Sequence, residues 1–152
     1  MSRLLQGLAA GAVGTTLLNA TTYADMALRG RPSSGLPAQD VEKLAERAGV
    51  SLGGDDDAAA ARKEGVGALM GLATGTAGGL AFALARPLAR VVPTPVAGVL
   101  AGAAVMAATD WSSIRLGTTD PSSWSVTDWA SDVVPHLAYG LGVAATFDRL
   151  GR

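Results

Sequence analysis

The sequence predicts an all-α fold, an integral membrane four-helix bundle with glycine-mediated packing. Of its 152 residues, 49% are apolar and only 16% are charged, and the apolar residues are gathered in four runs. The clearest run, residues 65–85, contains no charged residue. A helix of about 21 residues rises roughly 30 Å, which is the thickness of the hydrocarbon core of a bilayer.

This run also contains a glycine ladder, formed by Gly67, Gly71, Gly75 and Gly79 at four-residue spacing. That spacing places the four glycines on one face of a helix. In water each would cost up to about 1 kcal/mol relative to alanine, whereas between membrane helices a glycine lets two backbones approach closely. We therefore interpret the ladder as the central crossing element of the bundle.

The whole chain is expected to form a single membrane domain, residues 1–152. The four spanning helices are expected at about 3–28, 58–86, 95–116 and 128–150. Pro87 ends the second of them, Pro95 lies in the first turn of the third, and Pro135 interrupts the fourth.

Two further pairs of glycines repeat the four-residue spacing of the ladder. The first helix carries Gly7 and Gly11, and the third carries Gly98 and Gly102. We expect both pairs to lie at close helix crossings.

The connection between the first two spans contains a short amphipathic helix at about 38–48. Val41 and Leu44 share its apolar side, and charged residues lie opposite. Such a helix is expected at the membrane interface or on a partner. The acidic run 55–57 that follows is interpreted as a cap of the next helix rather than a calcium site.

The two halves of the chain also resemble each other. The sequence Pro-Ser-Ser occurs at 32–34 and again at 121–123, each time between two predicted helices. One interpretation is a two-helix unit used twice. Because each unit crosses the membrane an even number of times, such repeats would be parallel.

The distribution of basic residues favours cytoplasmic N and C termini, because cytoplasmic loops are enriched in Lys and Arg. Near the termini and the second connection the basic residues are Arg3, Arg86, Arg90, Arg149 and Arg152. The first connection opposes this orientation, since it carries six basic residues of its own.

Ionisable residues in or beside a span are a hypothesis for a functional site. Antiparallel threading places Asp25, Asp110, Asp132 and His136 at the same membrane face, and Asp132 and His136 are one helical turn apart. The other candidates for this polar layer are Asn19, Tyr23 and Tyr139. A structural role stays open, because aromatic and acidic residues are also common at the ends of spans.

The composition argues against several classes of function. The chain has no cysteine and one histidine, so thiolate sites and a bis-histidine haem within one chain are excluded, and zinc ligands are lacking. The formal net charge is −1 with no basic patch, which argues against nucleic-acid binding. We expect no cofactor, no metal and no catalytic residue.

The leading functional hypothesis is a non-enzymatic membrane protein, surrounded by lipids, that forms a homo-oligomer or serves as a small subunit or scaffold of a larger membrane complex. Its basis is the number of glycine faces. The alternative is a transporter or a proton or ion pathway that uses Asp132 and His136 with Asp25 and Asp110. A third hypothesis is lipid or quinone binding between helices.

The second half of the chain resembles the YagU-like bacterial inner-membrane proteins. The residues that carry the resemblance are Gly98–Ala103, Leu116-Gly117-Thr118, Pro121, Ser131-Asp132-Val133, His136-Leu137 and Tyr139. The first half shares only the glycine-rich first helix and an Arg-Pro turn. The resemblance implies a multi-span protein of the bacterial inner membrane, without established catalytic activity and associated in general terms with acid tolerance. It implies no catalytic residues.

Overall fold

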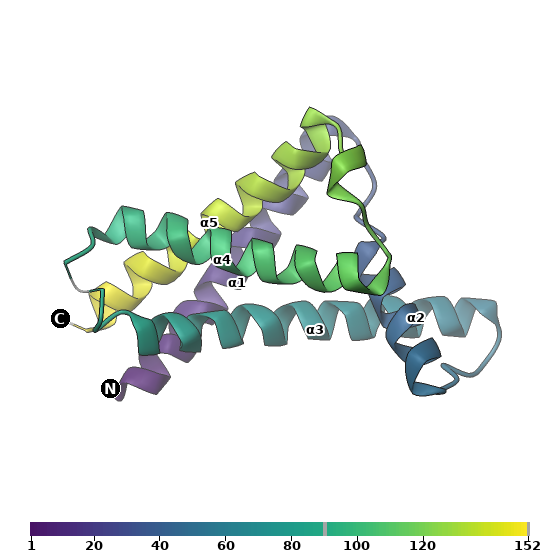
Figure 1. Cartoon of the computed structure of the whole chain (residues 1–152), viewed down its shortest axis with the longest axis horizontal. Coiled ribbons are helices and arrows are strands. Elements are labelled where there is room, and N and C mark those ends of the chain that lie inside the picture. Colours follow the sequence, from purple (N-terminus) through teal and green to yellow (C-terminus); the bar gives the residue numbers. More distant parts are fainter. Residues whose placement is uncertain (90, 152) are drawn as a thin grey trace.

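The computed structural model describes residues 1–89 and 91–151, and within these ranges it contains helices and no strand. Figure 1 shows the arrangement. The α-helices are α1 (Arg3–Arg29), α2 (Leu36–Ala48), α3 (Asp56–Ala85), α4 (Thr94–Leu116) and α5 (Val126–Leu150), and a 3₁₀ turn, η1, covers Pro121–Ser123. The all-α class is therefore confirmed. Arg90 and Arg152, used above for the orientation, lie outside the described residues.

Two of the helices in the described ranges, α3 and α4, are long enough and apolar enough to cross a membrane. The criteria are the length of the helix, the mean hydropathy of its apolar stretch and the number of charged residues in that stretch. Helix α5 runs without a break through Pro135, although proline cannot donate the N–H that would bond to the carbonyl of Ser131.

The centre of the molecule is the contact between α1 and α5, which run antiparallel and leave both termini at the same end (Figure 1). Helix α3 packs on α1, helix α4 packs on α5, and α3 and α4 touch each other only slightly. The prediction that the ladder helix is the central crossing element is therefore wrong. The physical reason is Gly14 of α1, where an added Cβ would lie only 2.9 Å from the Tyr139 carbonyl oxygen of α5.

The predicted close crossings occur within the chain. A Cβ on Gly11 would lie 2.8 Å from the carbonyl oxygen of Gly75, so α1 and α3 meet backbone to backbone. Helices α4 and α5 meet in the same way, because a Cβ on Gly98 would lie 3.0 Å from the carbonyl oxygen of Gly140. An added Cβ would meet Ala83 at Gly7, Gly11 at Gly79 and the His136 backbone at Gly102.

The four glycines of the ladder do not share one neighbour. Gly75 and Gly79 face α1, whereas Gly67 faces Pro37 of α2. Gly71, between them, has no described atom within 4 Å of the position of an added Cβ. Its predicted packing role is therefore not fulfilled within one chain. Gly71 lies between the contact of α3 with α1, at Gly75, and the contact of α3 with α2, at Gly67, and neither neighbour reaches it.

Helix α2 docks on its own chain. It packs on α3 and α4, with Val41 buried beneath it. Its Asp40 carboxylate accepts hydrogen bonds from Ser113 Oγ (2.6 Å) and from Thr118 Oγ1, and Arg47 Nη2 donates to the Arg115 carbonyl oxygen at 2.9 Å. These bonds cover the C-terminal end of α4, whose last carbonyls have no partner inside the helix.

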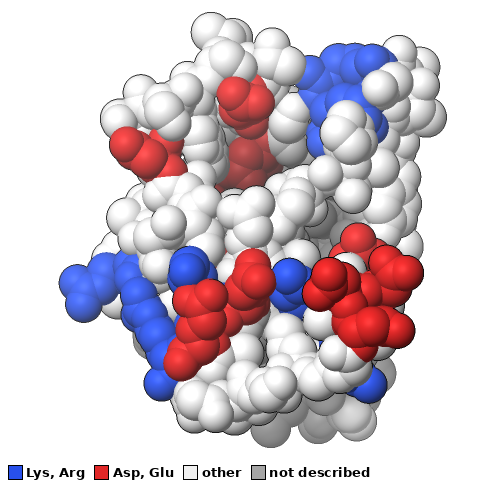
Figure 2. Space-filling view, turned by 90° about the vertical axis from the view of Figure 1, so that its right-hand side faces the viewer, with Lys and Arg blue, Asp and Glu red and all other residues white. Residues whose placement is uncertain are grey.

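Figure 2 shows the end of the molecule where α2 lies, and charged side chains of both signs gather there on an otherwise uncharged surface.

At the opposite end of the molecule, polar contacts that we call the Arg86–Asp148 clamp join α3, α4 and α5. Arg86 Nη2 lies 2.8 Å from Asp148 Oδ2, to which Thr94 Oγ1 donates at 2.5 Å. The apolar core beside this clamp contains the edge-to-face pair of Phe82 and Phe147.

Candidate functional site

Three of the predicted polar residues come together where α4 meets α5. The close approach of Gly102 to the His136 carbonyl brings the two backbones together, and Asp110 follows two turns later on α4. Asp132 lies one turn before His136 on α5. We call Asp110, Asp132 and His136 the acid–histidine cluster.

The geometry of the cluster is defined by His136 Nδ1. This nitrogen lies 3.1 Å from Asp132 Oδ1 and 2.8 Å from the Asp132 backbone carbonyl oxygen. The Asp132 and His136 side chains are only 22% and 14% exposed. Asp110 reaches them from α4, close enough to interact electrostatically with both. The predicted pairing of Asp132 with His136 is therefore present.

The second carboxylate oxygen of Asp132 is the unusual atom of this site. Asp132 Oδ2 is buried and accepts no hydrogen bond from a described N–H or hydroxyl group, and the neighbouring Asp110 carboxyl can bond to Asp132 only when one of the two carries a proton. Buried polar atoms are nearly always paired, and an unpaired one costs free energy. The α4–α5 contact therefore holds a carboxylate with an unused acceptor beside a second carboxyl and an imidazole.

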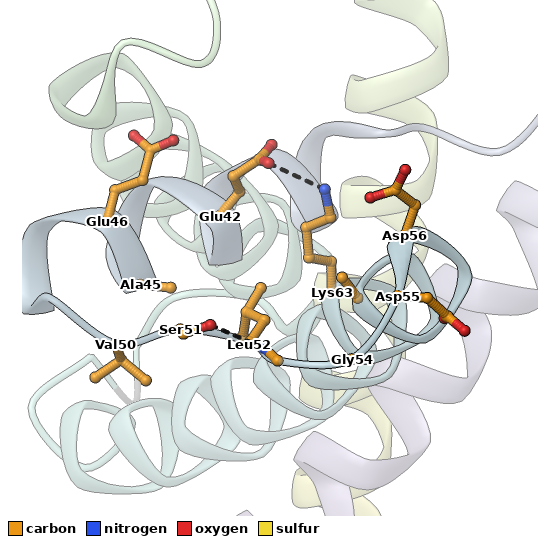
Figure 3. A pocket seen from close by; sticks show the side chains of 12 residues that line it. Glu42, Ala45, Glu46, Val50, Ser51, Leu52, Gly54, Asp55, Asp56 and Lys63 are labelled. Carbon is orange, nitrogen blue, oxygen red and sulfur yellow. Dashed lines mark hydrogen bonds and ion pairs between the residues drawn. The ribbon is translucent and has the colours of Figure 1, made fainter.

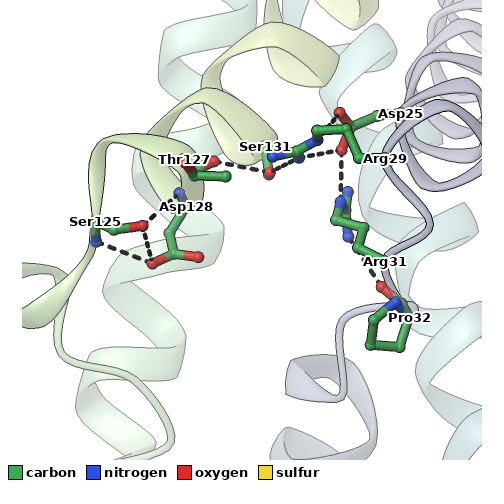
Figure 4. A network of polar contacts seen from close by, with 8 residues as sticks. All are labelled: Asp25, Arg29, Arg31, Pro32, Ser125, Thr127, Asp128 and Ser131. Carbon is green, nitrogen blue, oxygen red and sulfur yellow. Dashed lines mark hydrogen bonds and ion pairs between the residues drawn. The ribbon is translucent and has the colours of Figure 1, made fainter.

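Asp25 lies apart from the cluster, in an ion-pair network at the end of α1 (Figure 4). Its carboxylate pairs with Arg29 and, at 2.5 Å, with Arg31. Arg29 also donates to Ser131 Oγ on α5, the residue next to Asp132. Asp25 therefore does not join the acid–histidine cluster. Its ion-pair network and the cluster both lie near the N-terminal part of α5.

A pocket of about 240 Å³ opens beside this network, between α1 and α5. It is lined by Thr21, Asp25, Arg29, Ala130, Ser131, Val134 and Pro135. Its volume lies below the roughly 300 Å³ at which pockets for drug-sized ligands begin. The lipid or quinone hypothesis stays a prediction.

The remaining candidates have other positions. Tyr139 is 1% exposed, and its Oη donates to the Gly75 carbonyl oxygen at 2.7 Å, so it joins α5 to α3 in the core. Asn19 is partly buried and Tyr23 is 62% exposed on α1. In the described part of the chain no hydrogen bond joins any of these three side chains to the cluster.

A second pocket, of about 300 Å³, lies between α2 and the start of α3 (Figure 3). Lys63 Nζ bonds to Glu42 Oε1 across it at 3.0 Å. Asp55 Oδ1 accepts from the Ala58 N–H at 2.9 Å, which is the helix cap expected for the acidic run. Among the described residues no group of three His, Cys, Asp or Glu side chains is arranged to hold a metal ion.

Sequence reasoning missed the polar contacts that fasten the helices together. The pairing of Asp25 with Arg29 has a visible signal, because the two residues are one turn apart on a helix. The bond from Ser113 to Asp40 and the Arg86–Asp148 pair have no such signal, since 73 and 62 residues separate the partners.

The described residues thus define an all-helical protein with two membrane-length helices and an acid–histidine cluster. Comparisons with protein-family models, with curated proteins and with solved structures find no match. The resemblance to the YagU-like proteins therefore stays a prediction from the sequence.

Proposed function

We propose that α1, α3, α4 and α5 all cross a membrane as one four-helix bundle, in the bacterial inner membrane and with both termini in the cytoplasm. Large apolar side chains on α3 and α4 support this proposal, because a bilayer would solvate them and water would not. The exposed residues on these two helices include Leu69, Leu72, Leu84, Val96, Val99 and Leu100.

The glycine crossings support the same architecture. In each half of the chain one helix pair meets through a Gly-xxx-Gly step, with Gly7 and Gly11 on α1 and Gly98 and Gly102 on α4. Membrane helices associate through such close contacts, because lipid provides no hydrophobic force between them. This similarity between the halves favours the two-helix repeat.

For function, we propose that the acid–histidine cluster takes up and releases a proton in a transport or coupling step. The observation that carries the proposal is the buried Asp132 Oδ2, which accepts no hydrogen bond from a described N–H or hydroxyl group and lies beside His136 and the Asp110 carboxyl. Ionisable groups at membrane depth are expensive, and a purely structural pair would be expected to use its acceptors.

The charges of the cluster fit this role. With both carboxylates ionised, the cluster carries a net charge of about −2 when the imidazole is neutral and about −1 when it is protonated. This change in net charge alters the desolvation cost of the cluster, and it therefore alters how tightly α4 and α5 are held together. Proton binding can drive a helix rearrangement in this way.

The test is proton flux into proteoliposomes under an imposed pH gradient. We expect the wild-type protein to carry a flux that Asp132→Leu and His136→Ala each lower by tenfold or more. The matched control is Asp120→Asn, which removes a carboxylate in the connection before α5 and leaves the cluster intact. Equal flux from all four proteins would contradict the proposal.

A second candidate function is self-assembly through the outer face of α3, as a homo-oligomer or a subunit of a larger complex. The observation that favours it is Gly71, which faces open space beside the exposed Leu69 and Leu72. Most of the other predicted packing glycines are used within the chain. Purified protein in nanodiscs would then form a dimer or larger species that Gly71→Leu reduces to a monomer. A monomeric wild-type protein without a co-purifying partner would exclude this function.

A further inference from the structure

The position of His136 fixes where its ring proton lies. Both groups near Nδ1 are oxygens that accept hydrogen bonds, namely the Asp132 carbonyl oxygen at 2.8 Å and Asp132 Oδ1 at 3.1 Å. A carbonyl oxygen has no proton to donate. Nδ1 therefore carries a hydrogen and donates it to Asp132, and in the neutral imidazole Nε2 has the free lone pair.

From this geometry we infer that Nε2 of His136 is the atom that gains and loses the proton, and that Asp132 is a positioning residue that holds the ring in the Nδ1–H form. The inference rests on the proposed function for its role in transport. The assignment of the tautomer stands on the two distances alone.

The proton balance of the step needs no co-reactant other than water. A hydronium ion gives its proton to Nε2, which forms the imidazolium ion and leaves a water molecule. The Nδ1–H bond to Asp132 is kept in both states. Loss of the Nε2 proton to water restores the neutral Nδ1–H ring.

The charged groups around the ring are consistent with this assignment. Asp132 comes from α5 and interacts at Nδ1, and Asp110 interacts with the ring from α4. Among the described residues these are the two ionisable groups that act electrostatically on His136.

The experiment is ¹⁵N NMR of the full-length protein, labelled at histidine and reconstituted in nanodiscs. His136 is the only histidine of the chain, so the spectrum belongs to one ring. Above the pH at which the ring titrates, we expect one tautomer, with Nδ1 at the shift of a protonated nitrogen and Nε2 at that of an unprotonated one. A spectrum with protonated Nε2, or with both tautomers, would overturn the inference.

Variants separate positioning by Asp132 from the general environment. Asp132→Leu removes the carboxylate but keeps the backbone carbonyl acceptor at 2.8 Å, so we expect the Nδ1–H form to stay the major one beside a measurable Nε2–H population. Asp132→Asn keeps a side-chain acceptor oxygen, and we expect it to retain the wild-type tautomer. Asp110→Leu is the matched control, with an unchanged tautomer. An Asp132→Leu spectrum identical to that of the wild type would refute the positioning role. If Asp132→Leu does not fold, the wild-type spectrum still decides the tautomer.

The two proposals fail separately. An Nδ1–H ring in a protein that shows no proton flux supports the tautomer and refutes the transport function. Proton flux through a protein whose ring carries its proton on Nε2 would support the transport function and refute the tautomer.

Discussion

At the scale of single residues, glycines differ according to what their missing side chain admits. Gly11 admits the backbone of α3, because an added Cβ would lie 2.8 Å from the Gly75 carbonyl oxygen and 2.9 Å from the Thr76 Cα. Gly71, on the ladder, admits no described neighbour. Equal spacing in the sequence therefore does not imply an equal role.

Substitution by leucine tests this difference. We expect Gly11→Leu to lower the free energy of unfolding by at least about 1–3 kcal/mol, because backbone atoms cannot move aside as a flexible side chain can. Gly71→Leu should change it little, or raise it by up to about 1 kcal/mol through helix propensity. Denaturant unfolding in mild detergent, followed by circular dichroism, measures both. Equal losses in the two variants would contradict the structure.

Asp120, in the connection between α4 and α5, is a second case at this scale. Hydrogen bonds from Ser122 Oγ (2.7 Å) and from the Ser122 N–H (3.0 Å) hold the pKa of its carboxyl below the ordinary value. The stabilisation from this lowered pKa is present in full above the unfolded-state pKa of about 3.9, and it is lost as the pH falls through the folded-state pKa.

Carboxyl ¹³C NMR measures this pKa directly. We expect the wild-type Asp120 to titrate below about 3.9, and Ser122→Ala to move the titration upward, since it removes the hydroxyl donor and leaves the backbone N–H. A wild-type titration at the ordinary value, unchanged by Ser122→Ala, would show that these bonds are not formed.

At the scale of elements, α2 is a clamp on the C-terminal end of α4. Its Asp40 accepts from Ser113 Oγ, and the Ser113 side chain is 3% exposed. Asp40→Ala leaves this buried hydroxyl without its partner, at a cost of about 1–3 kcal/mol. We expect faster hydrogen exchange along α2 and in the last turn of α4 as the clamp opens. The control is Glu46→Ala, which alters an exposed pair with Lys43 and should leave exchange in the last turn of α4 unchanged.

The sequence was sufficient to predict the helices and, within the candidate site, the contact between Asp132 and His136. Apolar runs, prolines and glycines predict where helices begin and end, and the one-turn spacing of Asp132 and His136 predicts their contact. The choice of helix partners was not predictable, because every glycine face is compatible with several neighbours. The central contact of α1 with α5 depends on Gly14 meeting Tyr139, and the Asp40 clamp joins residues with no shared periodicity.

At the scale of the whole molecule, the chain is fastened at both ends and closely packed between them. The α2 clamp holds one end, the Arg86–Asp148 pair holds the other, and the glycine crossings lie between. Asp132 and His136 lie in the first half of α5, and this helix begins at the end of the molecule opposite the termini (Figure 1). Proton access is therefore expected from the membrane face opposite the termini.

Because the chain has no cysteine, single substitutions report its topology without further changes. Four spans with cytoplasmic termini predict that Ser51→Cys and Ser122→Cys react with a membrane-impermeant maleimide on spheroplasts, and that Ser2→Cys reacts only after lysis. Ala10→Cys, at a position that is 0% exposed, should resist the reagent in both conditions. Reaction of Ser2→Cys and Ser51→Cys from the same side would mean that α1 does not cross. The bundle would then have only the crossings of α3, α4 and α5, and the cluster would lose its predicted access from the outer face.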